Sequence, residues 1–437
     1  MPATGISATL TDAIRLKRQA EKSDMSEHFD DSYEFPELRD NPLDAVQQAL
    51  EQGDNETALE LAETCLEENP FDVEALNYCA VAASNLGDHA KALMLYRKAL
   101  RFDPGNGALH HNFGVLLERL GRYQEAYDHF WRSLELQPDF PEAYVNLGNV
   151  LDEMGRTHEA LQMYRRALKR LPQAPDIYYN IGYALNRIGQ FAEAMEFFER
   201  ALALKPEDPA ALNGYGFALA NQGRDEEALV WYQRALEQAD TANYHYNLGL
   251  SLRRLGREQE ALQAFDRAIE RHPDFFEALI ERAIQLSHQD RFEEALADLN
   301  RAEQLDPESS EPAFYRSMVL ERWGRLPEAL REIERCLERD PDFGMARNNR
   351  GNLLLKLGRL DEALACFDAL LAESSDLAVA HYNRACVMAR KRQVREAVRS
   401  LEQAIAREPG FLRDALVDPD FDPIRQRPTF QALLQRK

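Results

Sequence analysis

The sequence has few of the features that mark membrane, disulfide-bonded or nucleic-acid-binding proteins. No run of 18 apolar residues occurs in its 437 residues, so it predicts no membrane-spanning helix. Its five cysteines form no CxxC pair, which argues against a zinc ribbon or a dithiol redox site. Lysine and arginine total 52 against 75 acidic residues, and the net charge of −23 disfavours nucleic acid as a partner. The first residues include no apolar core of signal-peptide length, so we expect a cytoplasmic location.

Signatures of catalysis are also absent from the sequence. We find no phosphate-binding P-loop, no GxSxG nucleophile elbow and no HExxH zinc motif. The GxG within NGYGFA (213–218) lies in a helical pattern with no strand before it, which excludes a dinucleotide-binding loop. The ten histidines show no metal-ligand spacing. The sequence therefore predicts no enzyme activity, no cofactor and no metal site.

One phrase recurs at a fixed interval along the sequence. The stretch YVNLGNVLDEMG (Tyr144–Gly155) has one counterpart upstream, HHNFGVLLERLG (110–121), and another downstream, YYNIGYALNRIG (178–189). In a frame that begins at Pro141, position 8 is small in nearly every copy, position 20 is alanine in every copy and position 32 is usually proline. Eleven copies fit this frame. The interval is about 34 residues, and a fixed period of this length is typical of solenoid proteins.

Each repeat has the pattern of a helical hairpin. In the fourth repeat, Tyr144, Gly148 and Leu151 fall on one stripe of a helix, and Gly155 can supply the left-handed turn that ends it. A second helix follows, with Ala160 on its packing face, and Pro172 stops it. One hairpin cannot bury both of its faces, so the hairpins must stack. The predicted fold is an all-α solenoid.

The frame resembles the tetratricopeptide repeat (TPR), and the resemblance covers most of the chain. It implies a right-handed superhelical solenoid of about eleven hairpins with a C-terminal capping helix. We divide the chain into an acidic N-terminal arm (1–38), the repeats (39–411) and a cap (412–437), in which Leu412, Leu416, Phe430, Leu433 and Leu434 should form two apolar faces. The predicted repeats are 39–72, 73–106, 107–140, 141–174, 175–208, 209–241, 242–275, 276–309, 310–343, 344–377 and 378–411.

The candidate binding residues form a stripe on the first helices. The resemblance implies that the first helix of each hairpin lines a concave groove, and that asparagine ladders in long arrays of this family, including those of O-linked glycosyltransferases, hold peptide main chains. Asparagine amides can both donate and accept, and we expect these side chains to face solvent. The predicted groove residues are Asn112, Asn146, Asn149, Tyr179, Asn180, Tyr183, Tyr246, Asn247, Asn349, Asn352 and Asn383. The ladder breaks at Gly214, Glu281 and Tyr315, which suggests a main site over 112–247 and a lesser one over 349–383.

Several interpretations remain open from the sequence. The main one is a non-enzymatic scaffold that binds an extended segment of another protein; the asparagines could also be inherited from repeat duplication. One alternative is an assembly protein that packs through its convex faces, with itself or with a larger complex, and another is the recognition subunit of an enzyme complex. A chaperone-tail clamp would need lysine at position 5, which this chain lacks. Arginines at position 7 favour ion pairs between hairpins over anion binding, and they are Arg282, Arg316, Arg350 and Arg384.

Charge is unevenly distributed along the chain. Residues 23–75 hold 17 acidic residues and one basic residue, for a net charge of −16. Residues 345–400 hold ten basic and six acidic residues, for a net charge of +4. The acidic arm could contact this basic segment in a salt-sensitive way or serve only to keep the chain soluble.

Overall fold

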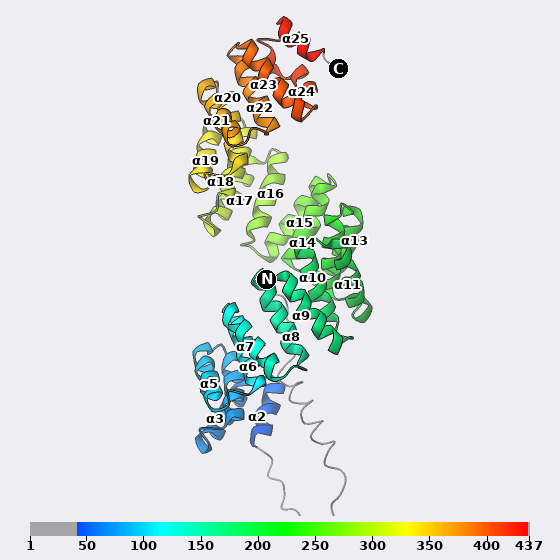
Figure 1. Ribbon diagram of the computed structural model, residues 1–437, viewed down its shortest axis with the longest axis vertical. Helices are drawn as coiled ribbons and strands as arrows, with labels where there is room; N and C mark the ends of the chain where they lie inside the picture. Colours follow the sequence, from blue (N-terminus) through cyan, green and yellow to red (C-terminus); the bar gives the residue numbers. More distant parts are fainter. Residues whose placement is uncertain (1–41, 436–437) are drawn as a thin grey trace, which may run out of the picture. The chain divides into compact units, whose positions relative to one another are not determined.

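The computed structural model describes residues 42–435, and in that range every regular element is a helix (Figure 1). The prediction of an all-α solenoid is confirmed, because consecutive helices pack on one another in pairs that repeat in order. The acidic arm lies outside the described residues. None of the helices in 42–435 is long and apolar enough to cross a lipid bilayer.

The helices alternate between two types. The first helices of the hairpins are α2 (Pro42–Glu51), α4 (Val73–Asn85), α6 (Gly107–Arg119), α8 (Pro141–Glu153), α10 (Pro175–Arg187), α12 (Pro209–Asn221), α14 (Ala242–Arg254), α16 (Phe276–His288), α18 (Glu311–Arg322), α20 (Gly344–Lys356) and α22 (Ala378–Arg390). The second helices are α3 (Asn55–Glu68), α5 (His89–Phe102), α7 (Tyr123–Leu136), α9 (Thr157–Arg170), α11 (Phe191–Leu204), α13 (Asp225–Gln238), α15 (Glu258–Arg271), α17 (Phe292–Leu305), α19 (Leu326–Arg339), α21 (Leu360–Glu373) and α23 (Val394–Arg407).

A glycine against an aromatic ring sets the spacing within most hairpins. A Cβ atom placed on Gly148 of α8 would lie 2.4 Å from the ring of Tyr164 in α9. Glycines at the same position of α6, α10, α12, α14 and α20 face rings in the same way. In the eighth repeat the second helix carries an aliphatic residue, Leu299, at the position that corresponds to Tyr164. The first helix of that repeat carries Ala283 in place of the glycine. In the six hairpins with glycine at this position, the glycine leaves room for the ring that packs on it, while the second repeat accommodates Ala80 together with Tyr96.

The turn inside each hairpin needs one residue in the left-handed conformation. Gly155 has a φ angle of 74°, and the corresponding glycines of eight other hairpins also have positive φ angles. The eighth and eleventh repeats have no glycine there, and Asp290 and Arg392 adopt a φ of 58° instead. Side chains other than glycine pay a conformational cost in this region, so these two turns are less favourable than the rest.

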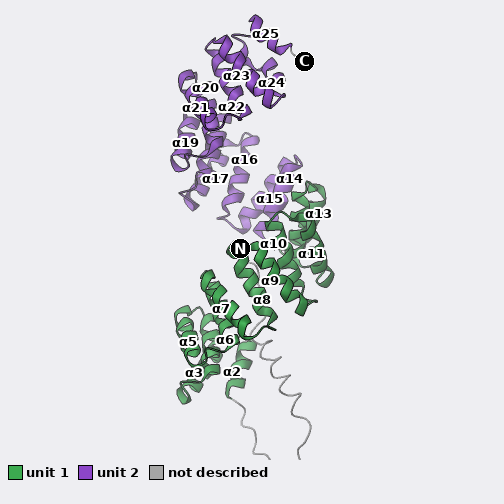
Figure 2. Ribbon diagram, in the orientation of Figure 1, with its two compact units in different colours: residues 1–239 green, residues 240–437 purple. Residues whose placement is uncertain are grey.

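The chain forms two compact units, one extending through Ala239 and the other beginning at Asp240 (Figure 2). The boundary falls in the link between α13 and α14, which comprises only residues 239–241, whereas the link between α9 and α10 comprises 171–174. The sixth predicted repeat, 209–241, is one residue shorter than the other ten. The residue it lacks is missing from the inter-repeat link, and no helix is shortened by it. We call the two parts the N-terminal unit and the C-terminal unit.

The arginines at position 7 tie helices together in the C-terminal unit, as predicted. Arg282 of α16 donates to Asp298 of α17 at 2.6 and 2.7 Å and to Asp266 of α15 at 2.9 Å. Arg316 is buried and pairs with Glu303 at 2.8 Å and Glu332 at 2.7 Å. These residues contribute to hairpin packing, and their charges are already neutralised.

The C-terminal cap consists of α24 (Phe411–Val417), the 3-10 helix η1 (Pro419–Phe421) and α25 (Pro428–Leu434). Phe430 and Leu433 are buried, as expected. The prediction for Leu416 was wrong, because this side chain is 49% exposed and Phe421 is buried in the cap instead. The reason is that α24 ends after two turns and η1 folds back onto α22, which turns Leu416 outward.

Candidate functional site

The candidate site is the surface formed by positions 5, 6, 9, 12 and 13 of the first helices, which we call the first-helix face. Within the N-terminal unit, α6 contacts α8, α8 contacts α10 and α10 contacts α12. Side chains on one first helix can therefore reach those on the next. Six of the eleven predicted groove residues lie on α6, α8 and α10, and the other five lie on first helices of the C-terminal unit.

A chain of hydrogen bonds connects three first helices. Asn146 of α8 donates from Nδ2 to His111 Nε2 at 2.9 Å. His111 Nδ1 lies 3.3 Å from Asn112 Oδ1 on the same helix, α6. Asn112 in turn donates to Asn77 Oδ1 of α4 at 3.0 Å. The ladder asparagines are therefore bonded to the preceding hairpin rather than to solvent alone.

This chain of hydrogen bonds determines the protonation state of His111. Because Nε2 accepts a hydrogen bond from Asn146, the ring must be neutral with its own proton on Nδ1, where it can donate to Asn112. Burial lowers the pKa of His111 to about 4, which favours the same neutral form. The ring also packs against Phe140 and Phe130, with centroids 4.6 and 5.6 Å apart.

Asn180 of α10 reaches a different acceptor. Position 5 of the preceding hairpin is Val145, which offers no side-chain acceptor, so Asn180 donates to Asn149 Oδ1 at 3.3 Å. The same oxygen accepts a 2.9 Å hydrogen bond from the hydroxyl of Tyr164. Asn149 is thereby held in place by both neighbouring elements, α9 and α10.

The expectation that the ladder asparagines face solvent was wrong for two of them. Asn112 is 8% exposed and Asn180 is 6% exposed, while Asn146 and Asn149 are half-buried. Helical geometry gives the direction of a side chain on its own helix. It does not show that the next first helix covers that side chain and supplies a hydrogen-bonding partner.

The C-terminal unit carries the rest of the ladder. Asn383 of α22 donates to Asn348 of α20 at 2.9 Å. Asn349 and Asn352 are half-buried, and neither side chain makes a hydrogen bond within residues 42–435. Asn247 on α14 is half-buried. At the break in the ladder, Glu281 lies 3.4 Å from Arg253 and forms an ion pair with it.

The predicted aromatic residues separate into packed and exposed ones. Tyr246 lies between Phe265 and Phe275, with centroids 6.0 and 5.0 Å away. Tyr179 stacks on Tyr183 at 6.1 Å, and Tyr183 itself is 43% exposed. Position 5 thus serves mainly for packing, and position 9 presents open aromatic area.

Sequence reasoning missed His111, Asn77 and Asn348 as partners of the ladder. A signal for them exists in the spacing, because three of these hydrogen bonds join residues 35 positions apart. That spacing links position 6 of one repeat to position 5 of the repeat before it. A polar side chain at position 5, followed by asparagine at position 6 of the next repeat, would have identified each pair.

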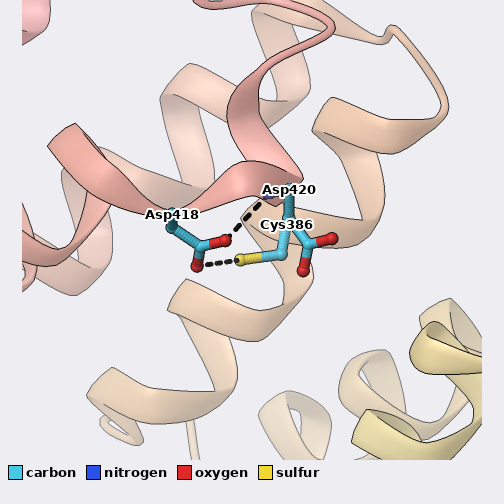
Figure 3. A group of neighbouring side chains, drawn as sticks. All are labelled: Cys386, Asp418 and Asp420. Carbon is cyan, nitrogen blue, oxygen red and sulfur yellow. Dashed lines mark hydrogen bonds between the residues drawn. The ribbon is translucent and has the colours of Figure 1, made fainter.

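One group in the described residues has the composition of a metal site. Cys386 Sγ and carboxylate oxygens of Asp418 and Asp420 lie within 4.8 Å of one another (Figure 3). The Asp418 carboxylate, however, already accepts from the Tyr382 hydroxyl at 2.8 Å, the Asp420 amide at 2.9 Å and the Cys386 thiol at 3.7 Å. Burial and the neighbouring Asp418 raise the pKa of Cys386, which keeps the thiol protonated. These contacts fasten the cap to α22, and the group needs no ion to account for it.

One family model for the tetratricopeptide repeat matches residues 43–107, 145–209, 246–310 and 318–378, which together are more than half of the chain. Two further models of the same repeat match 106–173 and 185–248. The chain belongs to the tetratricopeptide repeat family. Proteins with this fold are in general protein-interaction scaffolds, and their partners are typically proteins or peptides.

Several solved structures are similar to this TPR chain over part or most of its length. It is 29% identical to YrrB, described as a TPR protein with an unusual peptide-binding site, over 42% of this chain and 95% of that one, with a TM-score of 0.35. It is 24% identical to MamA over 38% and 91%, with a TM-score of 0.36. It is 15% identical to yeast Tom70 over 91% and 98%, with a TM-score of 0.45. No curated protein matches the sequence, so the assignment to the family rests on the repeat itself.

Proposed function

We propose that this TPR protein is a non-enzymatic scaffold whose first-helix face holds an extended segment of another protein. The proposal rests on one observation, the hydrogen bonding of the ladder asparagine side chains. The Oδ1 atoms of Asn146, Asn180 and Asn383 accept no hydrogen bond from the rest of residues 42–435, and none of them is sealed from solvent. Their Nδ2 groups are meanwhile held by neighbouring helices, so the oxygens are fixed in position before a partner arrives.

Oxygens held in this way suit the main chain of an extended peptide. Neighbouring first helices lie about 10 Å apart, and an extended chain advances about 3.3 Å per residue. One ladder amide would therefore meet roughly every third residue of the partner and accept a hydrogen bond from its backbone N–H. Such contacts give little sequence preference by themselves. We place the main site on the N-terminal unit, over Asn146 and Asn180, and a lesser one over Asn349 and Asn383. Asn112 is left out of the main site because its Oδ1 atom already accepts from His111 and its Nδ2 group donates to Asn77.

A second candidate function is assembly through the opposite surface of the solenoid. Its support is the exposure of large apolar side chains on second helices: Met94 on α5 is 61% exposed, Trp131 on α7 is 43% exposed and Val230 on α13 is 56% exposed. Contiguous patches of such residues mark protein interfaces, whereas single exposed apolar side chains are ordinary. We rank this function second because the exposed residues are scattered over several helices.

Paired substitutions on the two faces distinguish these functions. Tyr183→Asp with Phe217→Asp alters the first-helix face, and Trp131→Asp with Val230→Asp alters the second helices by the same chemical change. The partner captured from source cells is titrated into each variant by calorimetry. We expect the first variant to bind roughly tenfold more weakly or worse and the second to bind normally. The reverse result would refute the proposal and establish assembly through the second helices.

A further inference from the structure

Two carboxylates on the first-helix face of the N-terminal unit form no ion pair with another residue of 42–435. Glu118 of α6 is half-buried, Glu153 of α8 is exposed, and neither makes a hydrogen bond or ion pair within residues 42–435. The neighbouring Asp152 differs, since it pairs with Arg187 at 2.8 Å and accepts from the hydroxyl of Thr157 at 2.8 Å.

The surrounding cations are already committed elsewhere. Arg187 of α10 is held by the side chain and the carbonyl of Asp152. Arg119, next to Glu118 in sequence, donates to Ser84 and Asn85 of α4, each at 3.4 Å. Burial, with a further contribution from Glu153, raises the pKa of Glu118 to about 7. An incoming positive charge would therefore relieve an unfavourable arrangement that the chain itself leaves unresolved.

Exposed aromatic side chains continue this face onto the next two first helices. Tyr183 of α10 is 43% exposed, and Phe217 of α12 is 37% exposed. Phe217 forms an edge-type ring contact with Phe191, with centroids 6.5 Å apart, and more than a third of the residue stays exposed. Asn149 of α8 lies on the same face, and its Nδ2 group makes no hydrogen bond within 42–435.

We propose that the first-helix face of the N-terminal unit selects a partner segment that carries a lysine or arginine, which binds against Glu118 and Glu153. Further along the same segment, apolar side chains cover Tyr183 and Phe217. This inference rests on the proposed function. A basic residue of the partner complements the two carboxylates locally, and a basic segment also complements the net charge of −23 of the whole chain. Successive first helices are about 10 Å apart, so the basic residue and the first apolar residue should be separated by roughly three positions.

Synthetic peptides with blocked ends test this selectivity on the full chain. One set, built on serine and glycine, carries lysine three residues from phenylalanine, in both orders because the direction of the bound chain is open. The second set replaces the lysine with glutamate. Fluorescence polarisation should show the lysine set binding roughly tenfold more tightly, as expected for a partly desolvated ion pair.

Isosteric variants assign the preference to these carboxylates. Glu118→Gln with Glu153→Gln should abolish the tenfold preference and should not lower the melting temperature, since the change removes repulsion between like charges. Glu196→Gln, an exposed change on the second helix α11 with the same loss of charge per site, should leave the preference intact. Loss of the preference in the Glu196 variant would overturn the assignment, because it would then reflect net charge alone.

The remaining outcomes separate this inference from the proposed function. If Tyr183→Ser with Phe217→Ser weakens both peptide sets equally and no charge preference exists, the selectivity is refuted while peptide binding to this face stands. If neither set binds the wild-type chain, the selectivity is refuted, and the titration with the captured partner decides the proposed function separately. If millimolar Ca²⁺ raises the melting temperature of wild type but not of the double glutamine variant and removes the lysine preference, the carboxylates hold a metal ion, and the basic-residue proposal is overturned.

Discussion

Replacing Asn112 by alanine should destabilise the hairpins around α6. The substitution removes the hydrogen bond to Asn77 and the acceptor for the Nδ1 proton of His111, and both groups are buried. Two lost hydrogen bonds of ordinary strength, with partners left unpaired in the interior, amount to about 2 kcal/mol. By contrast, Asn349→Ala removes an amide that has no partner within residues 42–435 and should cost less than about 0.5 kcal/mol.

Hydrogen exchange read by mass spectrometry is the suitable assay, because long repeat arrays do not unfold in one cooperative step. A local loss of about 2 kcal/mol corresponds to roughly thirtyfold faster exchange of amides in α4, α6 and α8. The helices of the C-terminal unit should exchange at wild-type rates, since hairpins contact mainly their neighbours. Unchanged exchange in α6 of the Asn112→Ala variant would refute the hydrogen bonds between repeats and would indicate that the ladder asparagines face solvent.

Four further outcomes follow from the same packing and charge arguments. Gly148→Ala should cost about 1–3 kcal/mol in a local exchange measurement, because its Cβ would overlap the ring of Tyr164. Asp290→Gly should stabilise the eighth hairpin by about 1 kcal/mol, since glycine tolerates a φ of 58°. The pKa of Glu118 is raised to about 7 in the folded chain, so its charged form destabilises the fold increasingly as pH rises from 4.5. Glu118→Gln should therefore stabilise the N-terminal unit at pH 8, by at most about 3 kcal/mol, and should have no such effect below pH 4.5. The pKa of His111 is lowered to about 4, so stability is lost as pH falls from 6.5 towards 4. His111→Gln should flatten that dependence in the local stability of α6 read by hydrogen exchange.

The fold could be predicted from sequence because its determinants lie within one repeat. Gly155 and Pro172 mark where helices end, and the small residue at Gly148 marks where two helices touch, all inside a single hairpin. The same local rules placed Arg282 in ion pairs with both neighbouring second helices. Repetition of the pattern along the chain then leaves stacking as the way to bury the remaining apolar faces.

The candidate site was less predictable because it depends on contacts between repeats. The burial of Asn112 and the tautomer of His111 are decided by side chains that lie on other hairpins. Leu416 was misplaced for a related reason: η1 folds back onto α22, and a short apolar pattern gives no sign of that reversal. The unpaired state of Glu118 likewise follows only once Arg119 and Arg187 are seen to be engaged elsewhere.

Site-specific photo-crosslinking tests the central claim, that the first-helix face binds an extended segment of another protein, most directly. A photoreactive phenylalanine is placed at position 183 on α10 or, as the matched control, at position 230 on α13, both exposed in the free chain. The chain is then irradiated in its source cells, and the adducts are sequenced. The account predicts adducts from position 183 to a single extended stretch of another protein and none from position 230. Adducts from position 230 alone, whether to a second copy or to a larger complex, would contradict it.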